Sequence, residues 1–166
     1  MNTDQIQRIL DSDICVSRIG AKVLACDQLP TYIDRSRRAA FVINTDPSDM
    51  PGSHWVGLYY DAAYRFEYFD SFGLQPVHAQ IVSFIRRNSN RPLLFNSRHL
   101  QDTVSAVCGL YCIYFLLVKC RGGSMQRVLY PFSSSTRQWQ NDRIIYRLLR
   151  PRLTCPDTFY DDDIIG

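Results

Sequence analysis

Hydrophobic residues in the first third of the chain change from a helical to an extended pattern. Apolar residues at helical spacing predict a helix from Thr3 to about Leu10, with Thr3 as its N-cap. A less regular stretch follows to about Arg38. The continuous apolar run from Ala39 to Thr45 predicts a central strand, and the proline- and glycine-containing residues 46–52 predict a loop.

Two aromatic-rich segments, His54–Tyr60 and Tyr64–Asp70, predict a β-hairpin joined by residues 61–63. With a three-residue loop, Tyr60 would oppose Tyr64, and His54 would oppose Asp70. Directly paired side chains on one face have Cβ atoms about 4.5–5.5 Å apart. A two- or four-residue loop would change this register, so the pattern permits the contact between His54 and Asp70 without requiring it.

Helical periodicity returns after the hairpin. It predicts a helix over Pro76–Arg87, with the proline in its first turn. A short strand is expected over Leu93–Phe95, and a loop over Gln101–Val107. The residues of the Pro76–Arg87 helix that are expected to point inward are Val77, Ile81, Phe84 and Ile85.

The segment from Cys108 to about Lys119 is apolar nearly all round, which predicts a helix at the centre of the core. The sequence Arg-Gly-Gly-Ser after it predicts a glycine C-cap. A basic amphipathic helix is expected over Thr136–Arg150, ended by Pro151. Its expected inward residues are Trp139, Ile144, Ile145, Leu148 and Leu149.

These elements predict one domain of mixed α+β type over residues 1–166. The composition, with 46% hydrophobic and 21% charged residues, is that of an ordinary globular protein. The apolar stretch Val107–Val118 is too short to cross a bilayer, so no membrane association is expected. The N-terminus lacks a basic segment followed by an apolar one, the pattern of a secretory signal peptide, so the protein is not expected to be secreted.

Six cysteines include no C-x-x-C pair, and no cysteine–histidine cluster has the spacing of a metal site. Without a secretory leader, free thiols in a reducing compartment are expected. Cys112 and Cys120 lie inside the apolar helix and are expected to be core residues. The sequence therefore requires neither a metal nor a cofactor.

Charge is unevenly distributed although the net charge is only +3. Residues 119–152 contain eight basic residues and one acid, Asp142, and residues 157–166 form an acidic tail. Arginine-rich surfaces suit phosphate or carboxylate recognition. A simple solvated basic face is the alternative interpretation, and the composition alone favours it.

Four residues in chain order, His54, Asp70, Gln101 and Cys108, together predict a cysteine-protease site. Cys108 opens a helix, where free N–H groups and the helix dipole favour the thiolate. His54 would be the base, oriented through its second ring nitrogen by Asp70. The Gln101 amide and the Cys108 backbone N–H would stabilise the oxyanion.

Each of the four residues has an ordinary structural alternative. A cysteine that opens an apolar helix usually packs, a lone histidine is usually a satisfied polar residue, and an aspartate after a strand often caps a turn. The prediction therefore depends on the combination. Gly109, beside the thiol, is expected to let a substrate backbone approach closely.

The strings F-V-I-N-T, G-S-H-W, F-D-S-F-G and Q-x6-C-G-L-Y-C resemble those of the adenovirus proteases, the adenains. They are more distantly similar to the SUMO-specific proteases of the same clan. The resemblance extends weakly to N-D-R-I-I-Y-R-L-L near the C-terminus. By residue, it assigns the base to His54, the acid to Asp70, the oxyanion amide to Gln101 and the nucleophile to Cys108.

This resemblance implies a papain-like arrangement, with a mixed sheet packed against a central helix that starts at Cys108 and with further helices around it. It implies a cysteine endopeptidase that cleaves after glycine, in Gly-Gly or Gly-x motifs of viral capsid or core precursors. A SUMO or ubiquitin-like isopeptidase is the alternative, since F-D-S-F-G is close to the Y-D-S of that branch. The implied location is intracellular, in the host nucleus and the virion.

The resemblance also implies two accessory partners. Adenains use DNA as a cofactor, and the arginine-rich residues 119–152 suit that role. Mammalian-type adenains are activated by a viral peptide that is disulfide-linked to a cysteine eleven residues before the glutamine. Asn90 occupies that position here, so covalent activation by this route is not expected, and a non-covalent peptide activator is the alternative.

Overall fold

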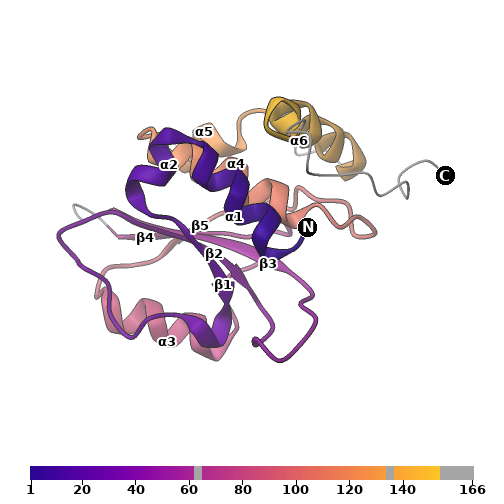
Figure 1. Cartoon of the computed structure of the whole chain (residues 1–166). Helices are drawn as coiled ribbons and strands as arrows, with labels where there is room; N and C mark the ends of the chain where they lie inside the picture. The colour runs from indigo at the N-terminus through magenta and orange to yellow at the C-terminus, as the bar shows by residue number, and fades with distance from the viewer. Residues whose placement is uncertain (62–64, 134–136, 154–166) are drawn as a thin grey trace.

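A mixed sheet runs through the middle of the molecule, with helices on both faces (Figure 1). The computed structural model describes residues 1–61, 65–133 and 137–153. In this part of the chain the sheet has five strands in the order β1-β2-β3-β4-β5. They are β1 (Lys22–Ala25), β2 (Ala39–Asn44), β3 (Trp55–Tyr60), β4 (Phe66–Phe69) and β5 (Leu94–Phe95). The outer pairs β1–β2 and β4–β5 are parallel and the inner pairs antiparallel, which confirms the predicted α+β class.

The helices divide between the two faces of the sheet. They are α1 (Thr3–Ser12), α2 (Ile14–Ile19), α3 (Ala79–Asn88), α4 (Cys108–Cys120), α5 (Met125–Leu129) and α6 (Gln138–Leu153), with a 3-10 turn, η1, at Cys26–Gln28. Figure 1 shows α3 below the sheet, and α1, α2, α4 and α5 above it, with α6 at the outer side of this upper layer. The sheet is therefore the middle layer of the domain.

Strand alternation supplies a hydrophobic core on each face of the sheet, because successive side chains of a strand point to opposite faces. Val42 of β2 and Tyr59 of β3 belong to the core under α4. Phe41, Ile43 and Leu58 belong to the core against α3. The strands are thus buried on both faces, which explains their nearly continuous apolar runs.

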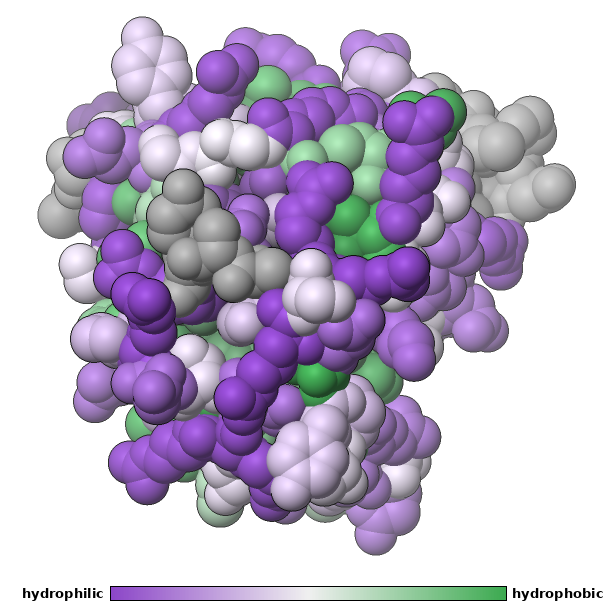
Figure 2. Space-filling view, turned by 90° about the vertical axis from the view of Figure 1, so that its left-hand side faces the viewer, coloured by the Kyte–Doolittle hydropathy of each residue, from purple (hydrophilic) through white to green (hydrophobic). Residues whose placement is uncertain are grey.

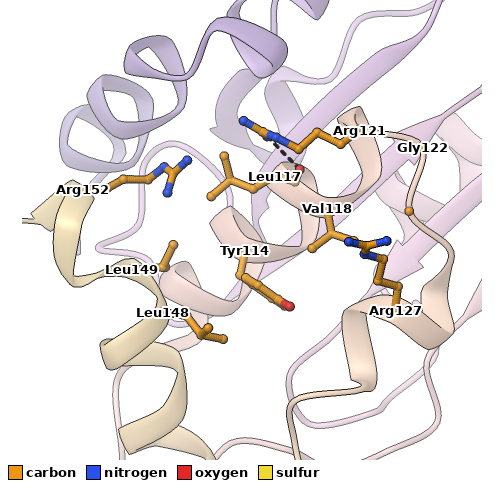
Figure 3. A pocket seen from close by; sticks show the side chains of 10 residues that line it. Tyr114, Leu117, Val118, Arg121, Gly122, Arg127, Leu148, Leu149 and Arg152 are labelled. Carbon is orange, nitrogen blue, oxygen red and sulfur yellow. Dashed lines mark hydrogen bonds between the residues drawn. The ribbon is translucent and has the colours of Figure 1, made fainter.

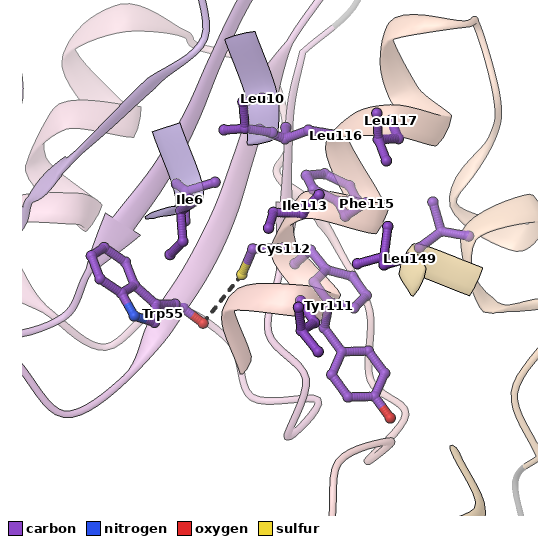
Figure 4. Packing of buried hydrophobic residues seen from close by; sticks show 14 of the residues in the cluster. Ile6, Leu10, Trp55, Tyr111, Cys112, Ile113, Phe115, Leu116, Leu117 and Leu149 are labelled. Atoms are coloured by element: carbon purple, nitrogen blue, oxygen red, sulfur yellow. Dashed lines mark hydrogen bonds between the residues drawn. The ribbon is translucent and has the colours of Figure 1, made fainter. Parts of the chain in front are cut away.

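Helix α4 packs directly across β3 and is buried along almost its whole length (Figure 4). Gly57 of β3 permits this contact, because a Cβ at this position would lie 2.6 Å from Cδ1 of Phe115. The Phe115 ring in turn stacks on Phe69 of β4, with ring centroids 5.2 Å apart. Cys112 is fully buried and donates from its sulfur to the Trp55 carbonyl at 3.3 Å. The predicted central helix and the core position of Cys112 are confirmed.

The end of α4 is a Schellman cap. Gly122 adopts a left-handed conformation with φ 78°, and its N–H donates to the Lys119 carbonyl at 2.9 Å. The N–H of Gly123 donates to the Val118 carbonyl at 3.0 Å. These two bonds satisfy carbonyls that the helix leaves unpaired, and the predicted glycine C-cap is confirmed.

The N-terminal prediction was right about the helix and wrong about its cap. Asn2 caps α1: its side chain accepts from the Gln5 N–H, while the Gln5 side chain accepts from the Asn2 N–H, both at 2.9 Å. The stretch treated as irregular contains α2, β1 and η1. Asp13 caps the six-residue helix α2, and Gly20 ends it with φ 69°. An element this short gives too few periodic positions to be recognised from sequence.

The two amphipathic helices differ from their predicted bounds. Helix α3 starts at Ala79 rather than Pro76, and Val77, expected to be inward, is 73% exposed. Helix α6 runs through Pro151 to Leu153. A proline in the last turn removes only one backbone hydrogen bond, and an ion pair of Arg152 with Asp13 at 3.0 Å anchors this turn.

Trp139 and Leu148 of α6 are exposed rather than inward, whereas Ile145 and Leu149 are buried. Thr136, the predicted first residue of this helix, lies outside the described residues. The acidic tail and Cys155 also lie outside them. Cys15, Cys26, Cys108, Cys112 and Cys120 are free thiols.

The hairpin of β3 and β4 has a different register from the predicted one. Tyr60 pairs with Phe66, and Gly57 with Phe69. The Asp61 N–H meets the Arg65 carbonyl at 3.4 Å, so the connection is displaced by one residue, to 62–64, which lie outside the described residues. The change moves each pairing by two residues and therefore preserves which side chains share a face.

The face of the molecule shown in Figure 2 is dominated by hydrophilic side chains, and apolar groups appear there as small patches among them. Apolar residues are instead concentrated in the two cores on either side of the sheet. Within residues 1–61, 65–133 and 137–153, no helix combines the length and the apolar character needed to span a membrane.

Candidate active site

The antiparallel hairpin places His54 and Asp70 together at one end of the sheet. His54 immediately precedes β3 and Asp70 immediately follows β4, so both residues lie at the same end of neighbouring strands. The Nε2 atom of His54 is 2.9 Å from Oδ1 of Asp70. Although the register was predicted incorrectly, the contact forms, because the shift of two residues leaves both side chains on one face.

Asp70 is held on both its side chain and its backbone. Its Oδ1 also accepts from the Phe72 N–H at 2.8 Å. Asn96, which follows β5, accepts from the Asp70 N–H at 2.9 Å and donates to the Asp70 carbonyl at 2.7 Å. Asp70 is 4% exposed and Asn96 1%. The carboxylate is thus fixed by contacts within the protein itself.

The imidazole of His54 lies between Asp70 and an aromatic ring. Phe72 stacks on it, with ring centroids 4.9 Å apart and an interplanar angle of 27°. Phe72 also meets His99 edge-on, with ring centroids 5.5 Å apart. The His54 side chain is 17% exposed. This packing restricts rotation of the ring and limits access of water to its bond with Asp70.

Cys108 is the first residue of α4, where helix N–H groups lack intrahelical acceptors. The thiol is 7% exposed and lies within hydrogen-bonding reach of the His54 ring. The structure therefore brings together three of the four predicted residues. Since Nε2 of His54 bonds Asp70, Nδ1 is the ring nitrogen left for the sulfur.

The pKa values of Cys108 and His54 shift in opposite directions. Burial alone would raise the pKa of the Cys108 thiol, but hydrogen bonds from His54 and the backbone of Trp55 and Gly109 lower it. Burial alone would lower the pKa of His54, but its bonds to Asp70 and Cys108 raise it to about 9. Both shifts favour a thiolate–imidazolium pair near neutral pH.

Gln101 lies in the loop before α4 and is 1% exposed. Its Oε1 accepts from the Ser71 hydroxyl at 2.7 Å, and its Nε2 donates to the Ser105 carbonyl at 2.7 Å. A carboxamide has two N–H donors, so one remains for another acceptor. The structure links Gln101 to the other three residues through Ser71, the neighbour of Asp70.

Gly109 has a different role from the one expected. A Cβ on this residue would lie 3.1 Å from Cδ1 of Ile6 and 3.6 Å from Cδ1 of Trp55. The glycine therefore allows α1 and β3 to approach the start of α4. It faces the interior of the protein rather than an approaching substrate, which corrects the prediction.

Sequence reasoning missed Ser71, Phe72 and Asn96. Ser71 and Phe72 directly follow Asp70 in the F-D-S-F-G string, so their proximity could have been noticed. Their contacts could not have been predicted. The contact of Phe72 with His54 depends on the hairpin register, and that of Ser71 with Gln101 depends on a loop about 30 residues away. An asparagine directly after the apolar strand at Leu93–Phe95 was the available signal for Asn96.

A polar recess of about 420 Å³ lies beside Trp55, the residue after His54. Asn2, Asn44, Asp46 and Ser48 contribute polar side chains to its wall. None of the four predicted site residues lines this recess, and Trp55 connects it to the site only as the residue that follows His54 in the chain. Among the described residues, no three His, Cys, Asp or Glu side chains are grouped as a metal site would require.

A second cavity, of about 350 Å³, lies between α4, α5 and α6 (Figure 3). Arg121, Arg127 and Arg152 surround a mainly apolar floor. Two of these arginines are paired with the buried Asp13, Arg121 at 2.7 Å and Arg152 at 3.0 Å. They therefore tie α2 to α4 and α6, which reduces the charge available for a ligand.

The family model described as adenovirus endoprotease matches residues 24–126, which is more than half of the chain and includes all four predicted site residues. The chain belongs to the adenovirus endoprotease family. The predicted resemblance is thus confirmed.

Curated members of the adenovirus endoprotease family are distant in sequence. A protease of Bovine adenovirus 4 is 28% identical over 118 residues, which cover 62% of this chain and 59% of the relative. A protease of Porcine adenovirus A serotype 3 is 25% identical over 136 residues, which cover 74% and 67%. The chain spans about half to two thirds of the length of the curated relatives it matches.

Among solved structures, the chain is similar to a crystal structure of an ASFV protease. The TM-score is 0.52 at 23% sequence identity, and the match covers 70% of this chain and 43% of the other. At this identity the likeness concerns the fold. It agrees with the sheet and central helix described above.

The opposite pKa shifts of His54 and Cys108 predict the pH dependence of alkylation by iodoacetamide. The rate at Cys108 should rise through a pKa below the ordinary 9.0 of a thiol, because only the thiolate reacts. Replacing His54 with alanine removes the largest stabilising contact, so the rise should move to higher pH. The rate at pH 7 should then fall, tenfold for each pKa unit by which the rise moves.

Mass spectrometry of the alkylated cysteines provides the measurement, with Cys112, whose pKa burial raises far above that of a free thiol, as an internal reference. A rate at Cys108 that is insensitive to His54→Ala would contradict the predicted pairing of thiol and imidazole.

Proposed function

We propose that this chain is a cysteine endopeptidase in which Cys108 is the nucleophile, His54 the acid–base residue, Asp70 its orienting partner and Gln101 an oxyanion donor. The observation that carries the proposal is the continuous set of contacts from Asp70 through His54 to Cys108 at the first residue of α4. Membership of the adenovirus endoprotease family supports it.

The chemistry begins with the thiolate of Cys108 attacking the carbonyl carbon of the scissile peptide bond. The oxygen of the tetrahedral intermediate becomes an anion, which the free N–H of Gln101 and the Cys108 backbone N–H would stabilise. The imidazolium of His54 then protonates the leaving amine, and the C–N bond breaks to give a thioester. Neutral His54 then takes a proton from water, the resulting hydroxide attacks the thioester, and the C–S bond breaks to release the carboxyl product and restore the Cys108 thiolate beside the His54 imidazolium.

Asp70 orients the catalytic base. An acceptor on Nε2 keeps the proton there and aims Nδ1 at the sulfur, and its negative charge stabilises the imidazolium. The bonds from Asn96 and Phe72 prevent the carboxylate from following the ring if His54 rotates. The proton needed by the leaving group is therefore held in place beforehand.

The proposed substrates are viral capsid or core precursor proteins cleaved after glycine, in Gly-Gly or Gly-x motifs. This specificity comes from the resemblance to adenains. A cleft that admits only glycine next to that bond would reject larger side chains by steric exclusion. The proposed location is the host nucleus and the virion.

A non-covalent peptide activator forms part of the same proposal. Asn90, at the position of the family's disulfide-linking cysteine, is exposed and precedes β5. In the described sheet β5 is an outer strand, and an outer strand presents backbone groups to which an extended peptide can pair. This arrangement supports peptide binding without a covalent bond.

DNA is the second proposed partner, and the ion pairs of the basic residues in 119–152 decide which of them we propose as contacts. Lys119 is buried in an ion pair with Glu67 at 2.7 Å, and Arg121 and Arg152 are paired with Asp13. Arg143 and Arg147 are exposed and lie one turn apart on α6. The exposed side of α6 is therefore the proposed contact surface.

A synthetic peptide containing Leu-x-Gly-Gly-x tests the proposed endopeptidase activity, with and without DNA. We expect cleavage after glycine by the wild type and none by Cys108→Ala. Gln101→Ala should lower kcat by roughly 10²–10³-fold, the usual effect of losing one oxyanion donor. Products are identified by mass spectrometry, and Cys112→Ala serves as the matched cysteine control.

Equal cleavage by Cys108→Ala would end this proposal. Ubiquitin and SUMO probes with a C-terminal electrophile distinguish the alternative function. Labelling of Cys108 by either probe, without cleavage of glycine-containing peptides, would indicate an isopeptidase instead.

DNA binding should be weakened by the double substitution Arg143→Glu/Arg147→Glu on α6. The matched control is Arg86→Glu/Arg87→Glu on α3, which covers the other face of the sheet. Fluorescence anisotropy with duplex DNA at increasing salt provides the measurement. Binding through phosphates should fall linearly in log affinity against log salt, and the α6 substitution should reduce the slope by about 2. Equal loss in the two variants, or affinity unchanged by salt, would rule out this surface.

A further inference from the structure

The loop that carries Gln101 is held from two sides by polar residues of other elements. On one side is the turn after β4, and on the other is the first part of α6. The loop itself contains no regular secondary structure from Leu100 to Val107. Its conformation therefore depends on these external contacts.

Ser71 makes three hydrogen bonds to this loop. Its carbonyl accepts from the N–H groups of Leu100 at 2.8 Å and Gln101 at 3.1 Å. Its hydroxyl donates to Oε1 of Gln101 at 2.7 Å, and Ser71 itself is fully buried. With the oxygen of the Gln101 amide fixed in this way, the NH₂ group must point away from Ser71. One of its N–H groups meets Ser105, which leaves the other for a substrate oxygen.

Two adjacent residues of α6 hold the opposite side of the loop. Asn141 donates from Nδ2 to the Leu100 carbonyl at 3.1 Å. Asp142 accepts from the Asp102 N–H at 3.2 Å and from the Tyr111 hydroxyl at 2.9 Å. Tyr111 belongs to the first turn of α4, which starts at Cys108. Asp142 thus connects the Gln101 loop to the helix of the nucleophile.

Asn141 and Asp142 are polar residues buried at the contact between α6 and the Gln101 loop. Asn141 is fully buried and Asp142 is 8% exposed. Burial raises the pKa of Asp142, and its hydrogen bonds only partly oppose that shift. Placing a carboxylate in such a site is costly, and an apolar residue would suit a purely structural helix contact better. Both residues also lie beyond residue 126, where the family match ends.

We propose that Ser71, Asn141 and Asp142 are positioning residues that hold the free N–H of Gln101 where the oxyanion forms. This inference rests on the proposed endopeptidase function. Ser71 sets the orientation of the amide, and the two α6 residues set the distance of its loop from Cys108. None of the three touches the substrate.

The first test measures kcat and KM for Ser71→Ala with the glycine-containing peptide. We expect kcat to fall by up to about 10²-fold with KM little changed, because a displacement of about 1 Å in a reacting group has an effect of this size. Ser83→Ala, at an exposed position of α3, is the matched control and should behave as wild type.

The same assay tests Asp142. Asp142→Asn keeps one acceptor oxygen, so its loss of kcat should be smaller than that of Asp142→Ala.

A double-mutant comparison shows whether Ser71 acts through Gln101. If it does, Ser71→Ala/Gln101→Ala should have the same kcat as Gln101→Ala alone, because the amide that Ser71 orients is already absent. Losses that simply multiply would show that Ser71 acts independently of Gln101 and would overturn the proposal.

Alkylation of Cys108 by iodoacetamide separates positioning from general damage to the fold. This displacement needs the thiolate and forms no oxyanion, so Ser71→Ala and Asp142→Asn should keep the wild-type rate and pH profile while losing turnover. Parallel loss of alkylation and turnover would overturn the proposal, and so would wild-type kcat in Ser71→Ala. In that last case the endopeptidase function would stand, whereas a wild type that cleaves no peptide would remove the function and this inference together.

Discussion

The hydrogen bond of 2.9 Å between His54 and Asp70 is the interaction on which the site depends. It offsets the burial that would otherwise favour a neutral ring, and with the Cys108 contact it raises the pKa of His54 to about 9. The protonated ring in turn is the largest influence lowering the pKa of the Cys108 thiol. Without the carboxylate, a buried imidazole and a buried thiol would both be neutral and far less reactive.

The scaffold keeps these groups in place through contacts far from the chemistry. Helix α4 must pass close to β3, which Gly57 permits, for its first residue to reach the end of the hairpin. Asn96 extends the sheet's hydrogen bonding to Asp70, and Phe72 covers the His54 ring. The site thus combines the first residue of α4 with residues at the ends of β3 and β4. The hydrophobic cores on the two faces of the sheet hold these elements in place.

Sequence reasoning predicted the parts of this structure that depend on local composition. The uninterrupted apolar run after Cys108 and the glycines at 122 and 123 were enough to define α4 and its end. The hairpin register, the start of α3 and the extension of α6 past Pro151 were wrong, because each depends on a loop or on a tertiary contact. The bond between Ser71 and Gln101 joins residues 30 positions apart and leaves no periodic signal.

Titration of His54 followed by histidine-selective NMR tests the central claim most directly, in the wild type and in Asp70→Asn. The ring should remain protonated until about pH 9 in the wild type, and its pKa should drop when the carboxylate becomes an amide. A wild-type His54 that loses its proton near the ordinary value of about 6.5, with no change in Asp70→Asn, would show that the carboxylate does not sustain an imidazolium beside Cys108.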